Sequence, residues 1–141
     1  MWLLDTNVVS ELMKPLPNPA VLAWLDGQPA TGLFSSVVTL AEIELGIALL
    51  PDGKRKVKLA AAASAVFEED FAGAVLAFDP AAARRYAEIV SVRIRNGRPI
   101  TSQDAEIAAI ALASDLVLVT RNEKDFSGIP GLSILNPWQA G

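Results

Sequence analysis

Residues 101–122 read TSQDAEIAAIALASDLVLVTRN, and this stretch decides the fold class. Its first part predicts a helix over 103–114, which the TSQD sequence begins. Its second part, LVLVT at 116–120, is a short apolar run and predicts a buried strand. A helix that leads directly into a continuous apolar strand is typical of a parallel sheet covered by helices on both faces.

The same alternation runs through the rest of the chain. Further strands are predicted at 2–4, 32–36, 74–78 and 132–135, and further helices at 6–13, from 19 onwards, at 38–50, at 54–71 and from 80 to about 96. No repeat, low-complexity tract or long linker divides these elements. We therefore expect one α/β domain that spans residues 1–141.

Two residue types are missing from the chain, and their absence restricts the chemistry. There is no cysteine and no histidine among the 141 residues. This excludes thiol nucleophiles, zinc–thiolate sites, Ser-His-Asp arrangements and histidine metal ligands. Hydrolytic chemistry must then rest on carboxylates with a hard cation, Mg²⁺ or Mn²⁺. The net charge of −4 gives no global attraction for nucleic acid, so an RNA substrate requires a local basic patch or a bound cation.

The apolar segments are too short to cross a membrane. None reaches the roughly 18 uninterrupted apolar residues that a span requires. Asp5 also lies where a secretory signal would carry its apolar run. We therefore expect a cytoplasmic protein without a membrane anchor.

Polar residues lie where the parallel sheet is expected to form its ligand cleft, at the carboxyl ends of the strands. Asp5 directly follows the first strand and Asn122 follows the fourth, while Glu42 and Asp104 are expected in the first turns of their helices. Clustered carboxylates resist ionisation unless a cation neutralises them. We predict a Mg²⁺ site, with Mn²⁺ as a substitute, held chiefly by Asp5 and Asp104, with Glu42 close by. Such an ion can activate a water for attack on a phosphodiester.

Helix capping is the alternative interpretation of each acidic position. TLAE at 39–42 has the form of a capping box, in which Glu42 would serve the start of its helix. Asp104 in TSQD is placed to interact with a helix dipole. Asp5 or Asn7 is suited to cap the first helix.

Three blocks of the sequence resemble the PIN-domain family. They are LLDTNVVSEL at 3–12, SSVVTLAEIELGIALL at 35–50 and ITSQDAEIAAIALASDLVLVTRNEKDF at 100–126. NPW at 136–138 resembles the end of the FitB-like branch of VapC toxins. The resemblance implies an α/β/α sandwich with a five-stranded parallel sheet. It also implies a Mg²⁺- or Mn²⁺-dependent endoribonuclease, the toxin of a type II toxin–antitoxin system, that cleaves RNA with a metal-activated water.

The resemblance further implies partners and site residues. It predicts a homodimer, a small DNA-binding antitoxin and a larger toxin–antitoxin assembly. Asp5, Glu42 and Asp104 match three of the acidic active-site positions. Many members have Asp where this chain has Asn122, a neutral oxygen donor. Asp125 is the alternative fourth acid.

Two groups of residues are expected to support the acidic positions. Thr6 and Thr120 are suited to hold the carboxylates by hydrogen bonds. Arg121 is the basic residue closest in sequence to the cleft, and we choose it first for a phosphate contact. The remaining basic residues either form solvated helix faces or guide RNA; they are Lys54, Arg55, Lys56, Lys58, Arg84, Arg85, Arg93, Arg95 and Arg98.

Two other functional classes stay open on sequence grounds. One is a phosphatase with Asp5 as nucleophile, which would need a second Asp at the position of Asn7. The other is a catalytically weak PIN-like module that binds RNA or protein, which the Asn at position 122 favours.

Overall fold

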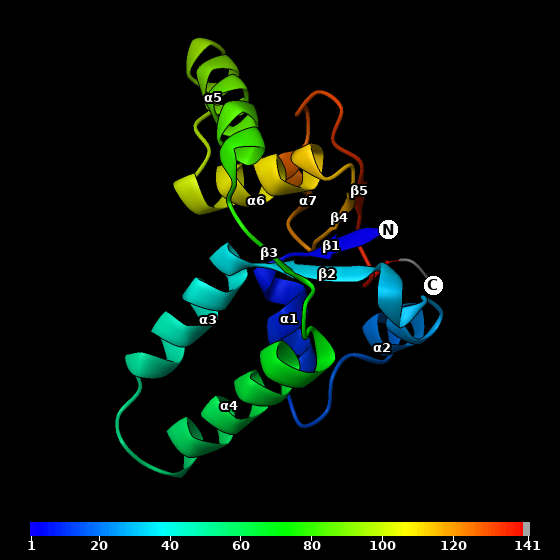
Figure 1. The fold of residues 1–141 in the computed structure, drawn as a ribbon, viewed down its shortest axis with the longest axis vertical. Helices are drawn as coiled ribbons and strands as arrows, with labels where there is room; N and C mark the ends of the chain where they lie inside the picture. Colours follow the sequence, from blue (N-terminus) through cyan, green and yellow to red (C-terminus); the bar gives the residue numbers. More distant parts are fainter. Residues whose placement is uncertain (140–141) are drawn as a thin grey trace.

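The computed structural model describes residues 1–139, and a parallel sheet lies at its centre (Figure 1). Its strands are β1 (Trp2–Leu4), β2 (Leu33–Ser36), β3 (Val75–Leu76), β4 (Val117–Val119) and β5 (Ile134–Leu135). They are hydrogen-bonded in the order β3-β2-β1-β4-β5, and every neighbouring pair is parallel. All five predicted strands are confirmed. The chain winds outward from β1 in both directions, so the winding reverses between β1 and β4.

Helices cover both faces of this sheet (Figure 1). On one face lie α5 (Pro80–Arg95), α6 (Ser102–Ala113) and α7 (Glu123–Phe126). On the other face lie α1 (Thr6–Leu12), α2 (Pro19–Asp26), α3 (Val37–Ala48) and α4 (Lys54–Ser64). The predicted α/β/α sandwich is therefore confirmed.

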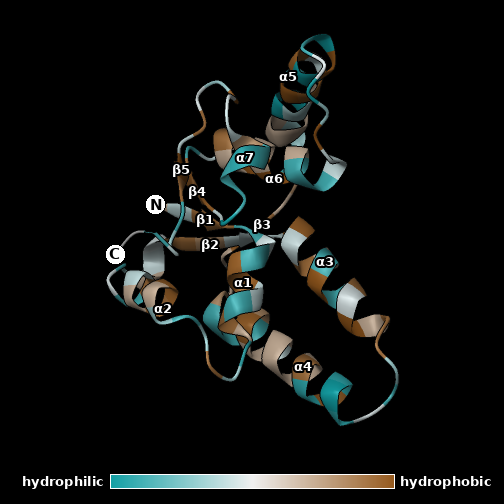
Figure 2. Cartoon of the chain, turned by 180° about the vertical axis from the view of Figure 1, so that it is seen from behind, coloured by the Kyte–Doolittle hydropathy of each residue, from teal (hydrophilic) through white to brown (hydrophobic). Residues whose placement is uncertain are grey.

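The period-two alternation of the strands divides the core into two parts. Leu3 and Leu118 pack with α5 and α6, whereas Leu4 and Val119 pack with α1 and α2. All four side chains are fully buried, and Figure 2 shows the hydrophobic colouring of the central strands. This double burial explains why the sequences of β1 and β4 are apolar without interruption.

The helix predicted over 54–71 is divided in two. Regular α4 ends at Ser64, and a π-helical segment, η2 (Ala65–Asp70), follows it. The Phe71 N–H donates to the Val66 carbonyl at 2.8 Å, which widens the last turn by one residue. This turn buries both Phe67 and Phe71. The short helix α7 was not predicted, because four residues are too few to show a helical period.

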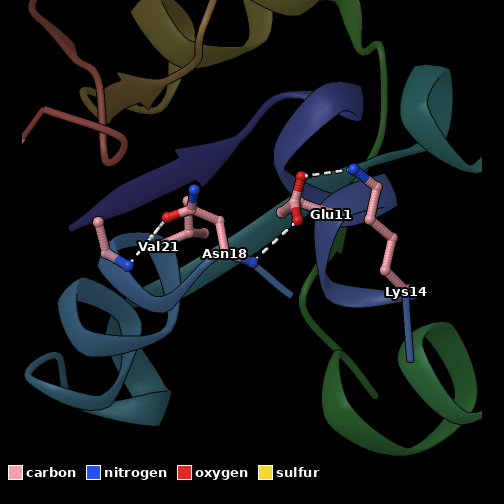
Figure 3. A network of polar contacts seen from close by, with 5 residues as sticks. Glu11, Lys14, Asn18 and Val21 are labelled. Carbon is pink, nitrogen blue, oxygen red and sulfur yellow. Dashed lines mark hydrogen bonds and ion pairs between the residues drawn. The ribbon is translucent and has the colours of Figure 1, made fainter. Parts of the chain in front are cut away.

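A buried glutamate fixes the turn between α1 and α2 (Figure 3). Glu11 accepts hydrogen bonds from Lys14 Nζ and from the Asn18 N–H, both at 2.9 Å. Asn18 in turn caps α2, since its Oδ1 accepts from the backbone N–H groups of Ala20 and Val21. The hydrogen bond from Lys14 lowers the pKa of Glu11 below its usual value, against the effect of burial. The sequence analysis did not identify this network.

No helix within residues 1–139 is both long enough and apolar enough to span a bilayer.

Candidate active site

Asp5 lies at the carboxyl end of β1, and three hydrogen bonds hold its side chain. Oδ1 accepts from the Thr6 N–H at 2.8 Å, and Oδ2 accepts from the Thr120 hydroxyl at 2.8 Å and from Asn7 Nδ2 at 3.2 Å. Asp5 is also the N-cap of α1, so the capping prediction is confirmed. Two carboxylate oxygens offer about four lone pairs, so these bonds leave capacity for one further ligand.

The environment of Asp5 opposes its negative charge. The residue is only 3% exposed, and burial raises its pKa from 3.8 to about 6. The hydrogen bonds from Thr120 and Thr6 oppose this shift, whereas the charges of Asp104 and Glu42 add to it. A carboxyl that titrates near neutrality among other carboxyls is a candidate functional group.

Glu42 belongs to the same network through Thr6. The Thr6 hydroxyl donates to Glu42 Oε1 at 3.1 Å and lies 3.0 Å from the Thr39 hydroxyl. Partial burial raises the pKa of Glu42, the Thr6 hydrogen bond opposes this, and the charges of Asp104 and Glu106 add to it.

The predicted capping role of Glu42 is wrong. Helix α3 begins at Val37, and the Ser36 hydroxyl accepts from the Thr39 N–H at 3.1 Å as its N-cap. Glu42 therefore lies in the second turn of the helix and not in the first. The helix begins earlier than predicted because Ser36, the last residue of β2, serves both elements.

Asp104 is the third residue of α6. The Thr101 hydroxyl caps this helix by accepting from the Asp104 N–H at 3.1 Å, so the predicted helix start at TSQD is confirmed. Burial raises the pKa of Asp104, the Thr101 hydroxyl opposes this shift, and the charge of Asp125 adds to it. The aspartate thus combines a capping position with a place in the coupled acidic group.

Asn122 and Asp125 differ in their relation to this group. The Asn122 N–H donates to the Thr120 hydroxyl at 3.0 Å, and its side chain makes no hydrogen bond within residues 1–139. Asp125 lies in α7 and lines, together with Asp104, a pocket of about 390 Å³. Of the two, Asp125 is therefore the one that faces Asp104.

Asn7 is a structural part of the site, and the sequence analysis did not predict this supporting role. Its Nδ2 donates to Asp5 Oδ2, and its Oδ1 accepts from the Arg121 N–H at 3.2 Å. The amide thus links the ends of β1 and β4. The supporting roles predicted for Thr6 and Thr120 are confirmed by their hydrogen bonds to Glu42 and Asp5.

Arg121 points elsewhere than predicted. Its guanidinium lies over the Trp138 ring, 4.9 Å from the ring centroid, and its charge lowers the pKa of Glu11. Trp138 packs against the core on the α1 face of the sheet. The basic residues that line the pocket beside Asp104 are instead Arg93, Arg98 and Lys124.

The donor set has the chemistry of a hard-cation site. Within residues 1–139 no three acidic side chains are arranged to ligate one ion directly. Mg²⁺ typically takes only one or two carboxylates and completes its shell with water. Asp5 and Asp104 can supply two such ligands, and the charge coupling between the carboxyls would be relieved by a cation. The residues present therefore fit Mg²⁺ or Mn²⁺.

Comparison with known proteins gives one family match and close relatives over nearly the whole chain. The PIN domain matches residues 2–132. The chain is 40% identical over 139 residues to the VapC ribonuclease Y4jK of Sinorhizobium fredii, covering 99% of each. It is 40% identical over 138 residues to Toxin FitB of Neisseria gonorrhoeae, covering 98% of this chain and 99% of that protein.

A solved structure, described as FitAB bound to an IR36 DNA fragment, is similar throughout. The TM-score is 0.89 at 38% identity, and the alignment covers 100% of this chain and 98% of the other.

Proposed function

The chain belongs to the PIN-domain family, and on this basis we propose that it is the endoribonuclease toxin of a type II toxin–antitoxin pair. The observation that carries the proposal is the hydrogen-bonded carboxylate group at the point where the winding of the sheet reverses. Asp5 and Thr120 follow the two strands that flank this point, and Glu42 joins them through Thr6. Open parallel sheets bind their ligands at such switch points. Cellular RNA as substrate implies action in the cytoplasm.

We propose that Asp5 and Asp104 hold the divalent cation, with Glu42 at its edge. The ion would supply positive charge to the phosphodiester and lower the pKa of a water. The protein supplies a fixed orientation for Asp5, because Thr6, Asn7 and Thr120 hold both carboxylate oxygens.

Glu42 is suited to accept the proton of the attacking water. Thr6 occupies Oε1, which leaves Oε2 free to take the proton, and the raised pKa of Glu42 makes its carboxylate a better base. Water as nucleophile, in place of the ribose 2′-hydroxyl, leaves a 5′-phosphate and a 3′-hydroxyl on the products.

We assign the fourth acidic position to Asp125 in preference to Asn122. Asp125 shares a pocket with Asp104, and its charge raises the pKa of that residue. Asn122 instead contributes its backbone N–H to Thr120, which in turn orients Asp5.

A small DNA-binding antitoxin is the proposed protein partner, in line with the description of a similar structure as FitAB bound to DNA. An acidic active site suits an inserted Arg or Lys of the antitoxin. A groove of about 710 Å³ between α1, α3 and α4 is suited to the adjoining antitoxin segment. Ile43, Ile47 and Leu59 line the groove, and Lys54 and Lys58 are among its basic residues, which favours an amphipathic segment with acidic residues.

We propose that the chain forms a homodimer through a surface separate from the groove between α1, α3 and α4. Val37, Leu45 and Phe78 line a hollow of about 400 Å³ beside Glu42, and their exposures are 37%, 60% and 37%. Large exposed apolar side chains gathered in one place are typical of protein contacts. A larger toxin–antitoxin assembly would join such dimers.

One assay tests the proposed activity against its rivals. The purified full chain, freed of antitoxin, is incubated with an RNA pool and, separately, with a phosphatase substrate, in Mg²⁺, Mn²⁺ or EDTA. We expect metal-dependent RNA cleavage that Asp5→Asn abolishes. Turnover of the phosphatase substrate alone would indicate the phosphatase, and RNA binding without cleavage would indicate a catalytically weak module.

A further inference from the structure

A second, basic pocket adjoins the acidic group on the α5 side. It has a volume of about 390 Å³, and Asp104 forms part of its wall. Three cationic side chains line it, namely Arg93, Arg98 and Lys124. Thr101 and Asp125 complete the polar lining. The pocket is therefore continuous with the candidate active site but opposite to it in its dominant charge.

Arg93 brings a buried positive charge to the pocket. The residue is 6% exposed, and its Nη2 donates to the carbonyls of Asp125 and Ser127 at 3.0 and 3.1 Å. These bonds fix α7 against α5. No acidic side chain of residues 1–139 forms an ion pair with Arg93. The charge of Asp125 acts on Arg93 only from beyond ion-pair distance. A buried guanidinium without a paired carboxylate favours a bound anion.

Arg98 and Lys124 offer accessible donors beside that charge. Both are exposed, and neither takes part in an ion pair within the described part of the chain. Arg98 Nη2 lies 3.4 Å from both the carbonyl and the hydroxyl of Ser127, which are long hydrogen bonds to neutral groups. The guanidinium packs against Gly128, where a Cβ atom would lie 3.0 Å from Nη1. Arg98 is thus held at the pocket by the loop after α7.

The charges indicate how RNA approaches an acidic centre. The carboxylates of Asp5, Glu42 and Asp104 repel a phosphodiester, and the protein as a whole is also negative. The basic pocket is the place beside Asp104 where cations outnumber acids, three to two. Phosphate oxygens are the ligands that such arginines and lysines bind with charge-assisted hydrogen bonds.

We infer that this pocket binds a non-scissile phosphate of the RNA, next to the phosphodiester that lies at Asp5 and Asp104. Arg98 and Lys124 donate to the phosphate oxygens. Arg93 is a positioning residue. It holds α7 through its hydrogen bonds to the Asp125 and Ser127 carbonyls, and its buried positive charge adds to the attraction for the phosphate. The inference rests on the proposed ribonuclease function, and it places the RNA beside the loop that joins α5 to α6 and beside α7.

RNA binding without cleavage separates this inference from the activity. The probe is a labelled single-stranded RNA oligonucleotide of mixed sequence, titrated in EDTA with the Asp5→Asn protein. We expect Arg98→Gln and Lys124→Gln, each added to Asp5→Asn, to weaken binding by about threefold to tenfold. Each variant should also reduce the magnitude of the slope of log K against log[salt] by about 0.7. Arg98→Lys should retain most of the affinity, because it keeps the charge.

Arg84→Gln is the matched control. It removes the same charge from an exposed position of α5 that does not line the pocket. In the cleaving protein, the pocket variants should raise KM more than they lower kcat, and the control should change neither.

The outcomes distinguish the two proposals. Unchanged RNA binding in both pocket variants overturns the inference, even if the wild-type chain cleaves RNA. If the pocket variants lose no more RNA affinity than Arg84→Gln does, the inference is also overturned, since the loss then reflects a general effect of charge. If the variants weaken only the complex with a copurified antitoxin, the pocket takes an acidic protein side chain and the inference is wrong. Weakened RNA binding in a chain that never cleaves RNA supports the pocket and overturns the proposed activity.

Discussion

The Thr120 hydroxyl donates to Asp5 Oδ2 across 2.8 Å and thereby joins the ends of two adjacent parallel strands. The Thr120 hydroxyl oxygen also accepts from the Asn122 N–H at 3.0 Å. Thr120 is fully buried, so no water replaces this hydrogen bond if the hydroxyl is removed. One side chain thus orients the central carboxylate and fixes the start of the segment that leads to α7.

Thr120→Val should destabilise the protein by about 1–3 kcal/mol at neutral pH, because it leaves a buried carboxylate oxygen with one donor fewer. Thr120→Ser keeps the hydroxyl and serves as the control. Urea unfolding followed by circular dichroism measures both. Equal stability of the valine and serine variants would show that the hydrogen bond contributes nothing.

The stability of the metal-free protein should fall as the pH rises from about 4 to about 6 on account of Asp5. Its pKa is about 6 in the folded protein and 3.8 ordinarily, so the folded state binds the proton more tightly than the unfolded state. The loss amounts to at most about 3 kcal/mol once the pH exceeds the folded pKa. The pKa values of Glu42 and Asp104 are raised too, so their contributions have the same sign.

The check compares the unfolding free energies of wild type and Asp5→Asn in EDTA at several pH values. The difference, wild type minus variant, should decrease as the pH rises. A difference that is constant with pH, or that increases, contradicts a raised pKa at Asp5.

Divalent cations should stabilise the wild-type chain and not the Asp5→Asn variant. Binding to the folded state alone raises Tm by mass action. Asp5→Asn should still fold, since Oδ1 of the amide can accept from the Thr6 N–H. Thermal unfolding in Mg²⁺ or Mn²⁺, together with calorimetric titration, measures the effect. Unchanged metal affinity in the variant removes Asp5 from the ligand set.

The residues at 122 and 125 should differ in the size of their effects. Asn122→Ala should lower the cleavage rate less than Asp5→Ala does, because the alanine variant keeps the backbone N–H that residue 122 donates to Thr120. Asp125→Asn should weaken Mn²⁺ binding, because it removes a negative charge beside Asp104. Asn122→Asp should tighten Mn²⁺ binding, because it adds a negative charge to the site.

Mn²⁺ titrations and cleavage rates of the four variants provide the comparison. Equal losses of cleavage rate in Asn122→Ala and Asp5→Ala would show that the Asn122 side chain is as important to the reaction as the Asp5 carboxylate. No change in Asp125→Asn would remove Asp125 from the site.

The order of the elements follows from the sequence because the central strands β1 and β4 are buried on both faces. Leu3, Leu4, Leu118 and Val119 are fully buried, and such strands appear as apolar runs between polar turns. The position of Asp5 follows in the same way, since a residue after a parallel strand lies at the ligand edge.

Other parts of the site could not be predicted from the sequence, because they depend on contacts distant in the chain. The bond from Thr6 to Glu42 spans 36 positions, and that from Thr120 to Asp5 spans 115. The sequence analysis predicted that both threonines hold carboxylates, but local spacing does not identify which carboxylate each threonine holds. For Arg121, closeness in sequence did not predict the position of the side chain. The residue follows β4 at the cleft edge, but its guanidinium lies over the Trp138 ring.

The chemical identity of the RNA ends tests the central claim most directly. The full chain, freed of antitoxin, is incubated with RNA in Mg²⁺ or Mn²⁺, beside Asp5→Asn, and the product termini are determined by ligation and mass spectrometry. We predict 5′-phosphate and 3′-hydroxyl ends, formed by the wild type and not by the variant, because the carboxylate group activates water. Products with 2′,3′-cyclic phosphates would contradict the account, since they arise from attack by the ribose hydroxyl, and so would equal cleavage by Asp5→Asn.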